Sequence, residues 1–301
     1  LYEDDFKIEP KYFIPILPGI LLNPSQGIGT GFASTILPRD PRELSAYILS
    51  SLTNENFERS KLLPYFEGFK GTVERSETEN NKYFIRGCFE RVNATQIKIT
   101  ELPVGMYLDD IKKQLNKLVE ADYIKDYDDN STEENFDIDV YFQRGYLNNV
   151  LDETLYDKLK LTTSVTENLT CWLPTGKLRK FDSVWAIIDY FIGWRLEKYE
   201  YRRSLLIELI DGDITALNEK VRFIYFYLEH VNEFRNASKF ELLTLLQENN
   251  FSDDLLDMKL WNLTKDKIEE LENNVKSKQI QKEELQNITN VKMYSKELES
   301  I

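Results

Sequence analysis

A glycine-rich segment, Gly27–Gly31, holds the residues whose types and spacing most directly suggest chemistry. It places one apolar side chain, that of Ile28, among glycines, and DNA-bending proteins insert such a side chain between base steps. The segment lacks the Lys-Ser or Lys-Thr pair of a phosphate-binding P-loop and the third glycine of the dinucleotide pattern. Two interpretations stay open from these residues alone: Ile28 is a wedge for DNA, or it is a core residue beside a structural turn.

Basic side chains form a second group with possible chemistry. Arg39 and Arg42 follow the glycine-rich segment, and a later cluster contains Lys177, Arg179 and Lys180. Cationic side chains position a nucleic acid by contacting its phosphates. Ordinary solvated surface charge explains the same residues equally well.

Acidic residues are concentrated between Asp122 and Asp139, where eight carboxylates accompany one lysine. We interpret this stretch as the solvated tip of a hairpin. A divalent-metal loop is one alternative, because Asp126-x-Asp128-x-Asn130 resembles the start of a calcium loop, although the Gly and the final Glu of that pattern are missing. A hydrolase with paired carboxylates is another, but no positioned base can be inferred.

Length and composition narrow the classes of function. The chain has 301 residues, of which 42% are hydrophobic, enough for a core and for two structural units. The net charge of −14 excludes a uniformly basic nucleic-acid coat and a polybasic membrane binder, but not a local DNA site. Two cysteines fit a reducing compartment, and the single histidine, His230, argues against a His-based metal site.

Targeting signals give a further expectation. No apolar run approaches the roughly 18–20 residues of a membrane span, and no signal peptide is visible. We therefore expect an intracellular protein with no membrane partner. Because the first residue is Leu1 rather than Met, we also expect the chain to be part of a longer protein.

The first half of the sequence predicts an α+β domain over residues 1–180. A helix is expected from Pro41, because apolar residues recur at helical spacing after it. Residues 70–101 and 136–142 alternate with a period of two and predict antiparallel strands, and residues 106–119 carry one helical stripe. Mixed strands and helices of this kind are typical of the α+β class.

The second half, residues 181–301, predicts a long helical arm. Helical periodicity runs from Val184 to about His230, interrupted at Asp211–Asp213, and a second long helix is expected from Lys265 to about Ile288. Lys278 and Lys282 break the apolar seam of that second helix. Shorter helical pieces lie between the two helices, which we expect to pair as an antiparallel coiled coil.

Short motifs that match those of one protein family lie in order along the whole chain. The family's "FKGT-[IV]-E" strand is matched by Phe69–Glu74, and its "I-[ST]-ELP" element by Ile99–Pro103. The other matching segments are Pro15–Pro18, Leu21–Asn23, Gln26–Ser34, Ile36–Arg39, Gly176–Leu178, Lys180–Val184, Leu255–Met258, Leu260–Trp261 and Leu263–Lys265. Each motif is modest, but in this order they strongly resemble the motifs of the type IIA DNA topoisomerases. Pro24 departs from the pattern, which usually has Gly after the residue matching Asn23.

Two details narrow the resemblance. The ending, with Thr289–Val291 and Tyr294–Glu299, looks like the close of the medium subunit of large-bacteriophage topoisomerases. Ile36–Pro38 after Phe32 and Ala33 is similar to the same group, since the eukaryotic enzymes tend to have a Trp-Ser pair there. The resemblance therefore suggests a phage-type or viral enzyme, acting in the host cytoplasm if phage and in the nucleus or a viral factory if eukaryotic-type.

The resemblance implies the DNA-gate portion of an ATP-dependent type II topoisomerase: a tower domain, a coiled-coil arm and a dimer gate at about residues 232–262. It implies that Ile28 inserts between bases, and that neighbouring residues contact double-stranded DNA. The expected DNA-binding residues are Asn23, Gln26, Gly27, Ile28, Gly29, Thr30, Arg39 and Arg42. The expected gate residues are Leu255, Leu256, Met258, Leu260 and Trp261, for which packing within one monomer is the alternative.

The resemblance also implies what other parts of the enzyme supply. The catalytic Arg-Tyr pair of the family lies some two dozen residues before the segment matching Leu1, so we assign no nucleophile here. Mg²⁺ and ATP are expected on another domain or subunit that carries the ATPase and the metal site, and no cofactor or metal site is expected in this chain. A homodimer through the gate is the expected assembly. The alternative interpretation is a non-enzymatic acidic α+β domain with a coiled-coil dimerisation stalk.

Overall fold

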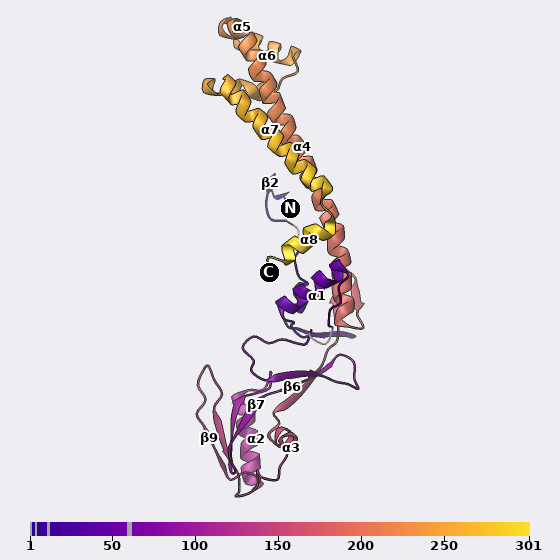
Figure 1. Cartoon of the computed structure of the whole chain (residues 1–301), viewed down its shortest axis with the longest axis vertical. Coiled ribbons are helices and arrows are strands. Elements are labelled where there is room, and N and C mark those ends of the chain that lie inside the picture. Colours follow the sequence, from indigo (N-terminus) through magenta and orange to yellow (C-terminus); the bar gives the residue numbers. More distant parts are fainter. Residues whose placement is uncertain (1, 4, 11–12, 59–61) are drawn as a thin grey trace. The chain divides into compact units, whose positions relative to one another are not determined.

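The computed structural model describes residues 2–3, 5–10, 13–58 and 62–301, and it divides into two compact units (Figure 1). Unit 1 comprises Leu1–Ile192 with Leu298–Ile301, and unit 2 comprises Gly193–Glu297. The predicted boundary at residues 180–181 precedes helix α4 (Val184–Glu229), whereas the units divide inside this helix. The first turns of α4 belong to unit 1, since the rings of Trp185 and Tyr47 lie 5.0 Å apart between centroids.

A four-stranded antiparallel sheet forms the largest core of unit 1. Its order is β7-β8-β10-β9, from β7 (Cys88–Asn93), β8 (Gln96–Glu101), β9 (Asp126–Asp129) and β10 (Ile138–Tyr141). Ile97 and Ile99 of β8 alternate inward and are fully buried against helix α2 (Leu108–Glu120) and helix α3 (Asp152–Leu159) (Figure 1). This pattern confirms the predicted mixture of period-two strands and amphipathic helices.

The acidic stretch belongs to this sheet. It contributes β9 and the start of β10, which pair from Asp126–Tyr141 to Asp129–Ile138. The stretch therefore does form a hairpin, but it supplies a paired strand as well as the predicted tip. Some of its carboxylates are paired, because Lys98 Nζ lies 2.8 Å from an oxygen of Asp137. Among the described residues, no group of three or more His, Cys, Asp or Glu side chains could hold a metal ion.

Smaller sheets make up the rest of unit 1. One has the order β11-β6-β5, and two others are the hairpins β3–β4 and β12–β13. Helix α1 (Pro41–Thr53) begins where predicted, because Asp40 caps it and Pro41 opens it. The remaining bounds are β1 (Tyr2–Glu3), β2 (Phe6–Lys7), η1 (Gly19–Leu21), β3 (Ser25–Gly29), β4 (Phe32–Ile36), β5 (Thr72–Arg75), β6 (Lys82–Arg86), β11 (Thr162–Thr166), β12 (Thr170–Trp172) and β13 (Leu178–Lys180).

Unit 2 is dominated by α4 and α7 (Lys265–Asn287), which run side by side in Figure 1. Helix α4 has 46 residues and continues without a break through Asp211–Asp213, where the sequence pattern is interrupted. The two acids face α7: Asp211 pairs with Lys282 at 2.6 Å and Asp213 with Lys278 at 2.8 Å. The earlier acid pairs with the later lysine, so α4 and α7 run antiparallel, as predicted. The acids that interrupt the apolar pattern of α4 therefore contact the lysines that interrupt the apolar pattern of α7.

A small helical cap joins the two arm helices. Its elements are α5 (Val231–Asn236), α6 (Lys239–Glu248), η3 (Asp253–Asp257) and η4 (Leu260–Asn262). Phe223 of α4 packs with Leu246, Phe251 and Leu255 in a core of its own. Helix α8 (Asn290–Leu298) follows α7 and carries the buried Tyr294.

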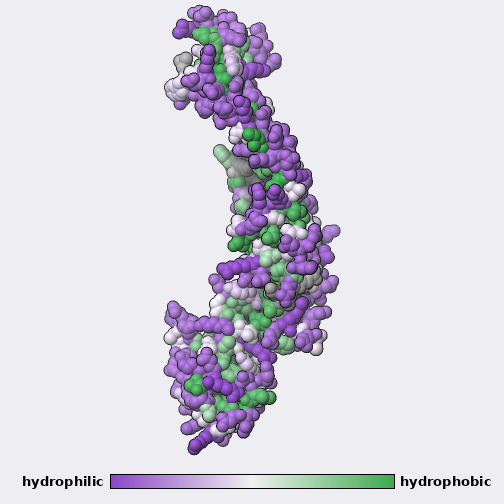
Figure 2. Space-filling view, viewed as in Figure 1, coloured by the Kyte–Doolittle hydropathy of each residue, from purple (hydrophilic) through white to green (hydrophobic). Residues whose placement is uncertain are grey.

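The visible surface of the molecule is mainly hydrophilic, with hydrophobic side chains in small patches (Figure 2). This agrees with the excess of 52 acidic over 38 basic residues. In the described part of the chain, no helix is both long and apolar enough to span a membrane.

Candidate nucleic-acid interface

The glycine-rich segment forms an antiparallel hairpin rather than a loose glycine turn. Ile28 pairs with Ala33, and Gly29 pairs with Phe32, which leaves Thr30 and Gly31 as a two-residue connection. Gly31 has a φ of +80°, a conformation that favours glycine and allows so tight a reversal. The local sequence therefore places Ile28 one residue before the end of β3.

Ile28 is 89% exposed, so the alternative that it is a core residue is wrong. The glycines beside it are not required by crowding inside the chain. Among the described residues, no atom comes within 4 Å of a Cβ built on Gly27, and at Gly29 the nearest is the Phe32 carbonyl oxygen at 3.9 Å. Open space on both sides of an exposed apolar side chain leaves room for a ligand backbone or groove to approach.

The other polar residues predicted for DNA contact lie on this hairpin or before it. Gln26 is exposed on β3, Thr30 is exposed at the tip, and Asn23 is exposed just after η1. The structure thus gathers Asn23, Gln26, Gly27, Ile28, Gly29 and Thr30 on one short segment. Arg42 is also exposed, in the first turn of α1, where its backbone N–H donates to Asp40 Oδ1 at 2.7 Å.

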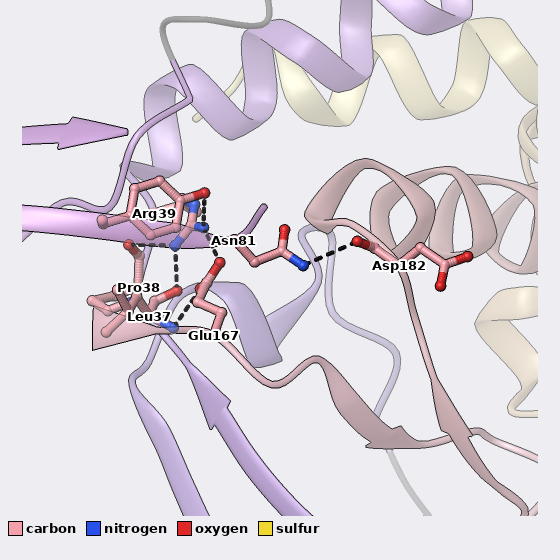
Figure 3. Close-up of polar contacts among 7 residues, drawn as sticks. Leu37, Pro38, Arg39, Asn81, Glu167 and Asp182 are labelled. Atoms are coloured by element: carbon pink, nitrogen blue, oxygen red, sulfur yellow. Dashed lines mark hydrogen bonds and ion pairs between the residues drawn. The ribbon is translucent and has the colours of Figure 1, made fainter. Parts of the chain in front are cut away.

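The prediction that Arg39 contacts phosphate is wrong in this structure, because its guanidinium is fully buried. Arg39 and Glu167 form an ion pair at 2.8 Å with both side chains 0% exposed (Figure 3). Arg39 also donates to the carbonyl oxygens of Leu37 and Pro38, at 2.7 and 3.3 Å, and to the hydroxyl of Tyr83 at 3.3 Å. Sequence reasoning missed this role because Glu167 lies 128 positions away.

Glu167 binds the base of the hairpin in two ways. Its Oε2 accepts from Arg39, and its Oε1 accepts from the backbone N–H of Leu37 at 2.8 Å (Figure 3). Its own N–H donates to the carbonyl oxygen of Asn81 at 2.8 Å. Asn81 Nδ2 in turn donates to the carbonyl oxygen of Asp182 at 3.0 Å, two residues before α4 (Figure 3). These bonds connect the end of β4, the turn before β6 and the start of the long helix.

Burial dominates the electrostatics of this cluster. The pKa of Tyr83 is raised above 10, chiefly because its hydroxyl is withdrawn from water, although the nearby charge of Arg39 acts in the opposite direction. Tyr83 therefore serves as a neutral hydrogen-bond partner of Arg39.

A second hairpin lies beside the first. Thr35 of β4 pairs with Asn168 just before β12, with their backbone N–H and carbonyl groups exchanging bonds at 3.0 and 2.9 Å. This hairpin brings the later basic cluster, Lys177, Arg179 and Lys180, into the same part of unit 1, and all three residues are exposed. The guanidinium carbon of Arg179 lies 4.5 Å from the Phe181 ring centroid, so this residue is partly engaged within the chain.

Exposed aromatic side chains on these hairpins were not predicted. Phe32 is exposed on β4, and Trp172 is exposed at the end of β12. An aromatic residue five positions before a lysine cluster is a weak sequence signal that could have indicated Trp172. Strand pairing supplies the missing information, because it decides which residues share a face.

The predicted gate residues differ in how far their side chains are buried. Leu255 is only 5% exposed and packs inside the cap, so for it the alternative of packing within one monomer holds. Leu256 and Met258 are partly buried against the same cap, and the side chain of Leu260 lies outside what the structure describes. Trp261 is 70% exposed, with Lys259 Nζ 5.1 Å from its ring centroid. Phe240 of α6, which was not predicted, is 79% exposed.

Comparison with known proteins connects these features to one family. The family model for the A-type subunits of DNA gyrase/topoisomerase IV matches residues 1–299. The chain is 32% identical over 250 residues to DNA topoisomerase 2, mitochondrial, of Dictyostelium discoideum, covering 82% of this chain and 19% of that protein. It is 32% identical over 259 residues to DNA topoisomerase 2 of Pisum sativum, covering 84% of this chain and 17% of that protein.

A solved structure supports the same conclusion about the fold. The Plasmodium falciparum topoisomerase II DNA-binding, cleavage and re-ligation domain matches 99% of this chain and 45% of that chain, with a TM-score of 0.81 at 28% identity. The chain thus spans less than a fifth of the length of these two curated relatives. All of these relatives are eukaryotic, and the resemblance to phage or viral enzymes stays a prediction.

Proposed function

Because this chain belongs to the DNA gyrase/topoisomerase IV family of A-type subunits, whose model matches residues 1–299, we propose that it forms the DNA gate of a type II topoisomerase. In this function it holds and bends the duplex that is cut, while a second duplex passes through. The Plasmodium relative, described as a DNA-binding, cleavage and re-ligation domain, supports the assignment.

The exposure of Ile28 at the end of β3 is the observation that carries this proposal. A side chain of this size gains about 1.5–3 kcal/mol when it is withdrawn from water. Inserted between two base pairs, Ile28 makes this gain and replaces part of the lost stacking. Unstacking a base step costs a few kcal/mol, and the bent duplex recovers it through wider contact with protein.

The proposed DNA surface surrounds that wedge. It comprises Asn23, Gln26, Gly27, Ile28, Gly29, Thr30 and Arg42, together with Lys177 and Lys180. Arg39 is removed from this surface, because its buried guanidinium holds the base of the hairpin. Phosphate contacts by the basic members would set the position of the duplex, and the wedge would set its bend.

The proposed dimer contact lies in the cap of unit 2. Trp261 and Phe240 expose large aromatic surfaces, and aromatic side chains are enriched at protein interfaces. Leu256 and Met258 border the same cap and are proposed as its partly buried neighbours. A homodimer formed here would leave the two arms as the walls of the space for the transported duplex.

The remaining functions of the enzyme are proposed for other parts of the complete protein. These are the catalytic tyrosine, the ATPase, and the Mg²⁺ site with its carboxylates. We further propose an intracellular location wherever the enzyme's DNA resides: the host cytoplasm for a phage enzyme, the nucleus or a viral factory for a eukaryotic-type one.

The wedge is tested by Ile28→Ala in the complete enzyme, with bending of a labelled duplex measured by fluorescence energy transfer. We expect the bend to be lost while the dimer persists, because the variant removes the group that occupies the opened step. Ile280→Ala is the matched control, since Ile280 is another exposed isoleucine, on α7.

Equal bending by the wild type and the Ile28→Ala variant would contradict the wedge role. A dimerisation stalk with no role in DNA binding, the alternative function, predicts that both variants behave alike and that the wild type does not bend DNA.

A further inference from the structure

Trp172 is a large apolar side chain that the fold leaves in solvent. It closes β12 and is 73% exposed, and it is one of four tryptophans in the chain. A tryptophan brings 150–250 Å² of surface to any contact, roughly, together with a flat ring suited to stacking. Strand pairing shows which surface its ring shares.

The face that carries Ile28 can be followed across the first hairpin. Ile28 and Ala33 are paired residues of β3 and β4, so their side chains lie on one face of the hairpin. Thr35 is two positions beyond Ala33, and side chains two apart on a strand share a face. Gln26, the exposed partner of Thr35, lies on that face as well.

The same face continues onto the second hairpin. Thr35 pairs with Asn168 through two backbone hydrogen bonds, at 3.0 and 2.9 Å. The hydroxyl of Thr170 donates to Asn168 Oδ1 at 2.8 Å, which shows that these two side chains point the same way. Trp172 is two positions after Thr170 and so shares the face of Ile28. We call this face, from Ile28 to Trp172, the wedge face.

Regular strand geometry gives the spacing along the wedge face. Trp172 is two strands away from Ile28, about 10 Å, and offset by two residues, about 7 Å. The two backbones are therefore about 12 Å apart, or three to four base-pair steps at the 3.4 Å rise of DNA.

Positive charge accompanies Trp172 on the same face. Lys180 pairs with Thr170, so its exposed side chain lies on the wedge face, diagonal to Trp172, whose own partner is Leu178. Arg179 alternates to the other face, where it stacks on Phe181. An aromatic ring next to an exposed cation is complementary to a polyanion whose bases carry flat apolar surfaces.

We propose that Trp172 is a second DNA-contact residue, which packs its ring on the sugar and base surface of the deformed duplex three to four base pairs from the step opened by Ile28. Lys180 binds the adjacent phosphate. This inference rests on the proposed DNA gate and extends its contact surface to β12 and β13. The bend opened at Ile28 exposes the base surface on which Trp172 packs.

Salt dependence distinguishes the two contacts in the complete enzyme. Trp172→Ala is expected to weaken duplex binding about 10-fold at every salt concentration, because stacking releases no counterion. Lys180→Ala is expected to lower the slope of log K against log salt by about one, because one phosphate contact is lost. Trp172→Phe keeps a ring and should retain most of the affinity.

Tyr201→Ala is the matched control, because Tyr201 is a similarly exposed aromatic residue but lies on α4 in unit 2, outside both proposed contact surfaces. It should leave duplex affinity unchanged. Wild-type affinity of Trp172→Ala across the salt range would overturn the inference. So would a lowered melting temperature with unchanged affinity, which would show that another part of the protein covers Trp172.

The Ile28→Ala variant separates this inference from the proposed function. Loss of bending in Ile28→Ala together with unchanged affinity in Trp172→Ala would refute the role of Trp172 alone. A wild-type enzyme that neither binds nor bends the duplex would refute the DNA gate itself.

Discussion

The base of the β3–β4 hairpin and the middle of the arm hold their elements together by different means. At the hairpin base, Arg39 and Glu167 are paired with both side chains 0% exposed, and each makes a further hydrogen bond to the backbone around Leu37. On the arm, Asp211 and Lys282 pair with side chains 47% and 29% exposed. Buried charges are directional and costly to disturb, whereas half-exposed pairs are weak and tolerant.

The difference fits the proposed tasks of the two regions. A wedge has to meet one base step at one angle, so the elements behind it need a fixed arrangement. An arm needs length and antiparallel register, and its apolar contacts around Ile224, Ile268 and Leu271 supply both without a fixed bond. The largest effects of substitution should therefore fall at the hairpin base and the smallest on the arm.

Glu167→Ala should have the largest effect on stability. It leaves the guanidinium of Arg39 buried without its counter-charge, and breaking a buried pair in this way costs about 3–5 kcal/mol. Chemical denaturation of the complete protein measures the loss. The double variant Arg39→Met with Glu167→Leu should recover most of the stability, because apolar side chains of similar volume can replace a buried pair. An equal loss in the double variant would show that packing, not charge, holds this base.

Glu297→Gln should lower the stability by an intermediate amount, and it tests a charged group of intermediate exposure within unit 2. Glu297 accepts hydrogen bonds from Arg195 at 2.9 Å, from Arg202 at 2.7 Å and from the hydroxyl of Tyr199. Its side chain is 28% exposed, between the two extremes. Losing the carboxylate should cost about 1.5–3 kcal/mol, the range for hydrogen bonds to charged groups.

The same residue predicts a pH dependence. Burial alone would raise the pKa of Glu297, but the hydrogen bonds from Tyr199, Arg202 and Arg195 together lower it below 4.5. Because the folded pKa is the lower one, this stabilisation is present above pH 4.5 and is lost as the pH falls through the folded value. Denaturation of Glu297→Gln between pH 6 and pH 3, roughly, should show a flatter stability profile than the wild type. Parallel profiles would rule out this linkage.

Lys282→Ala should have the smallest effect. Its pair with Asp211 is half-exposed, and such pairs contribute about 0–1 kcal/mol and weaken with salt. Denaturation at low and high salt measures the difference. A loss of stability comparable to that of Glu167→Ala would contradict the contrast between the two regions, since it would make the arm as dependent on charge as the hairpin base.

The elements with strong periodicity could be predicted from the sequence. The arm helices, α2 and the strands around Ile97 and Ile138 repeat apolar residues at 3.6 or 2.0 positions, and local pattern is enough for these. The continuity of α4 through Asp211–Asp213 was less evident, because the lysines that face these acids come 65 and 71 positions later. Ion-pair partners that are so far apart in the sequence cannot be recognised from the local periodicity of apolar residues.

The position of the candidate site along the chain could be predicted, but the burial of its individual residues could not. The resemblance located the segment around Ile28, yet the residues alone left its burial open. Arg39 and Arg42 are three positions apart, and one is buried while the other is exposed. Leu255 and Trp261 differ in the same way within the cap. Strand register and long-range pairing decide each of these cases, and neither can be read from residue type.

The edge strand β9 has a consequence for how copies of the molecule associate. As the outer strand of its sheet, it leaves one row of backbone groups open to pairing with a strand of another chain. Its sequence, Asp126-Tyr127-Asp128-Asp129, places two exposed carboxylates along that row. If the β9 strands of two copies paired with each other, these like charges would be brought together. The acidic stretch therefore disfavours aggregation through this edge.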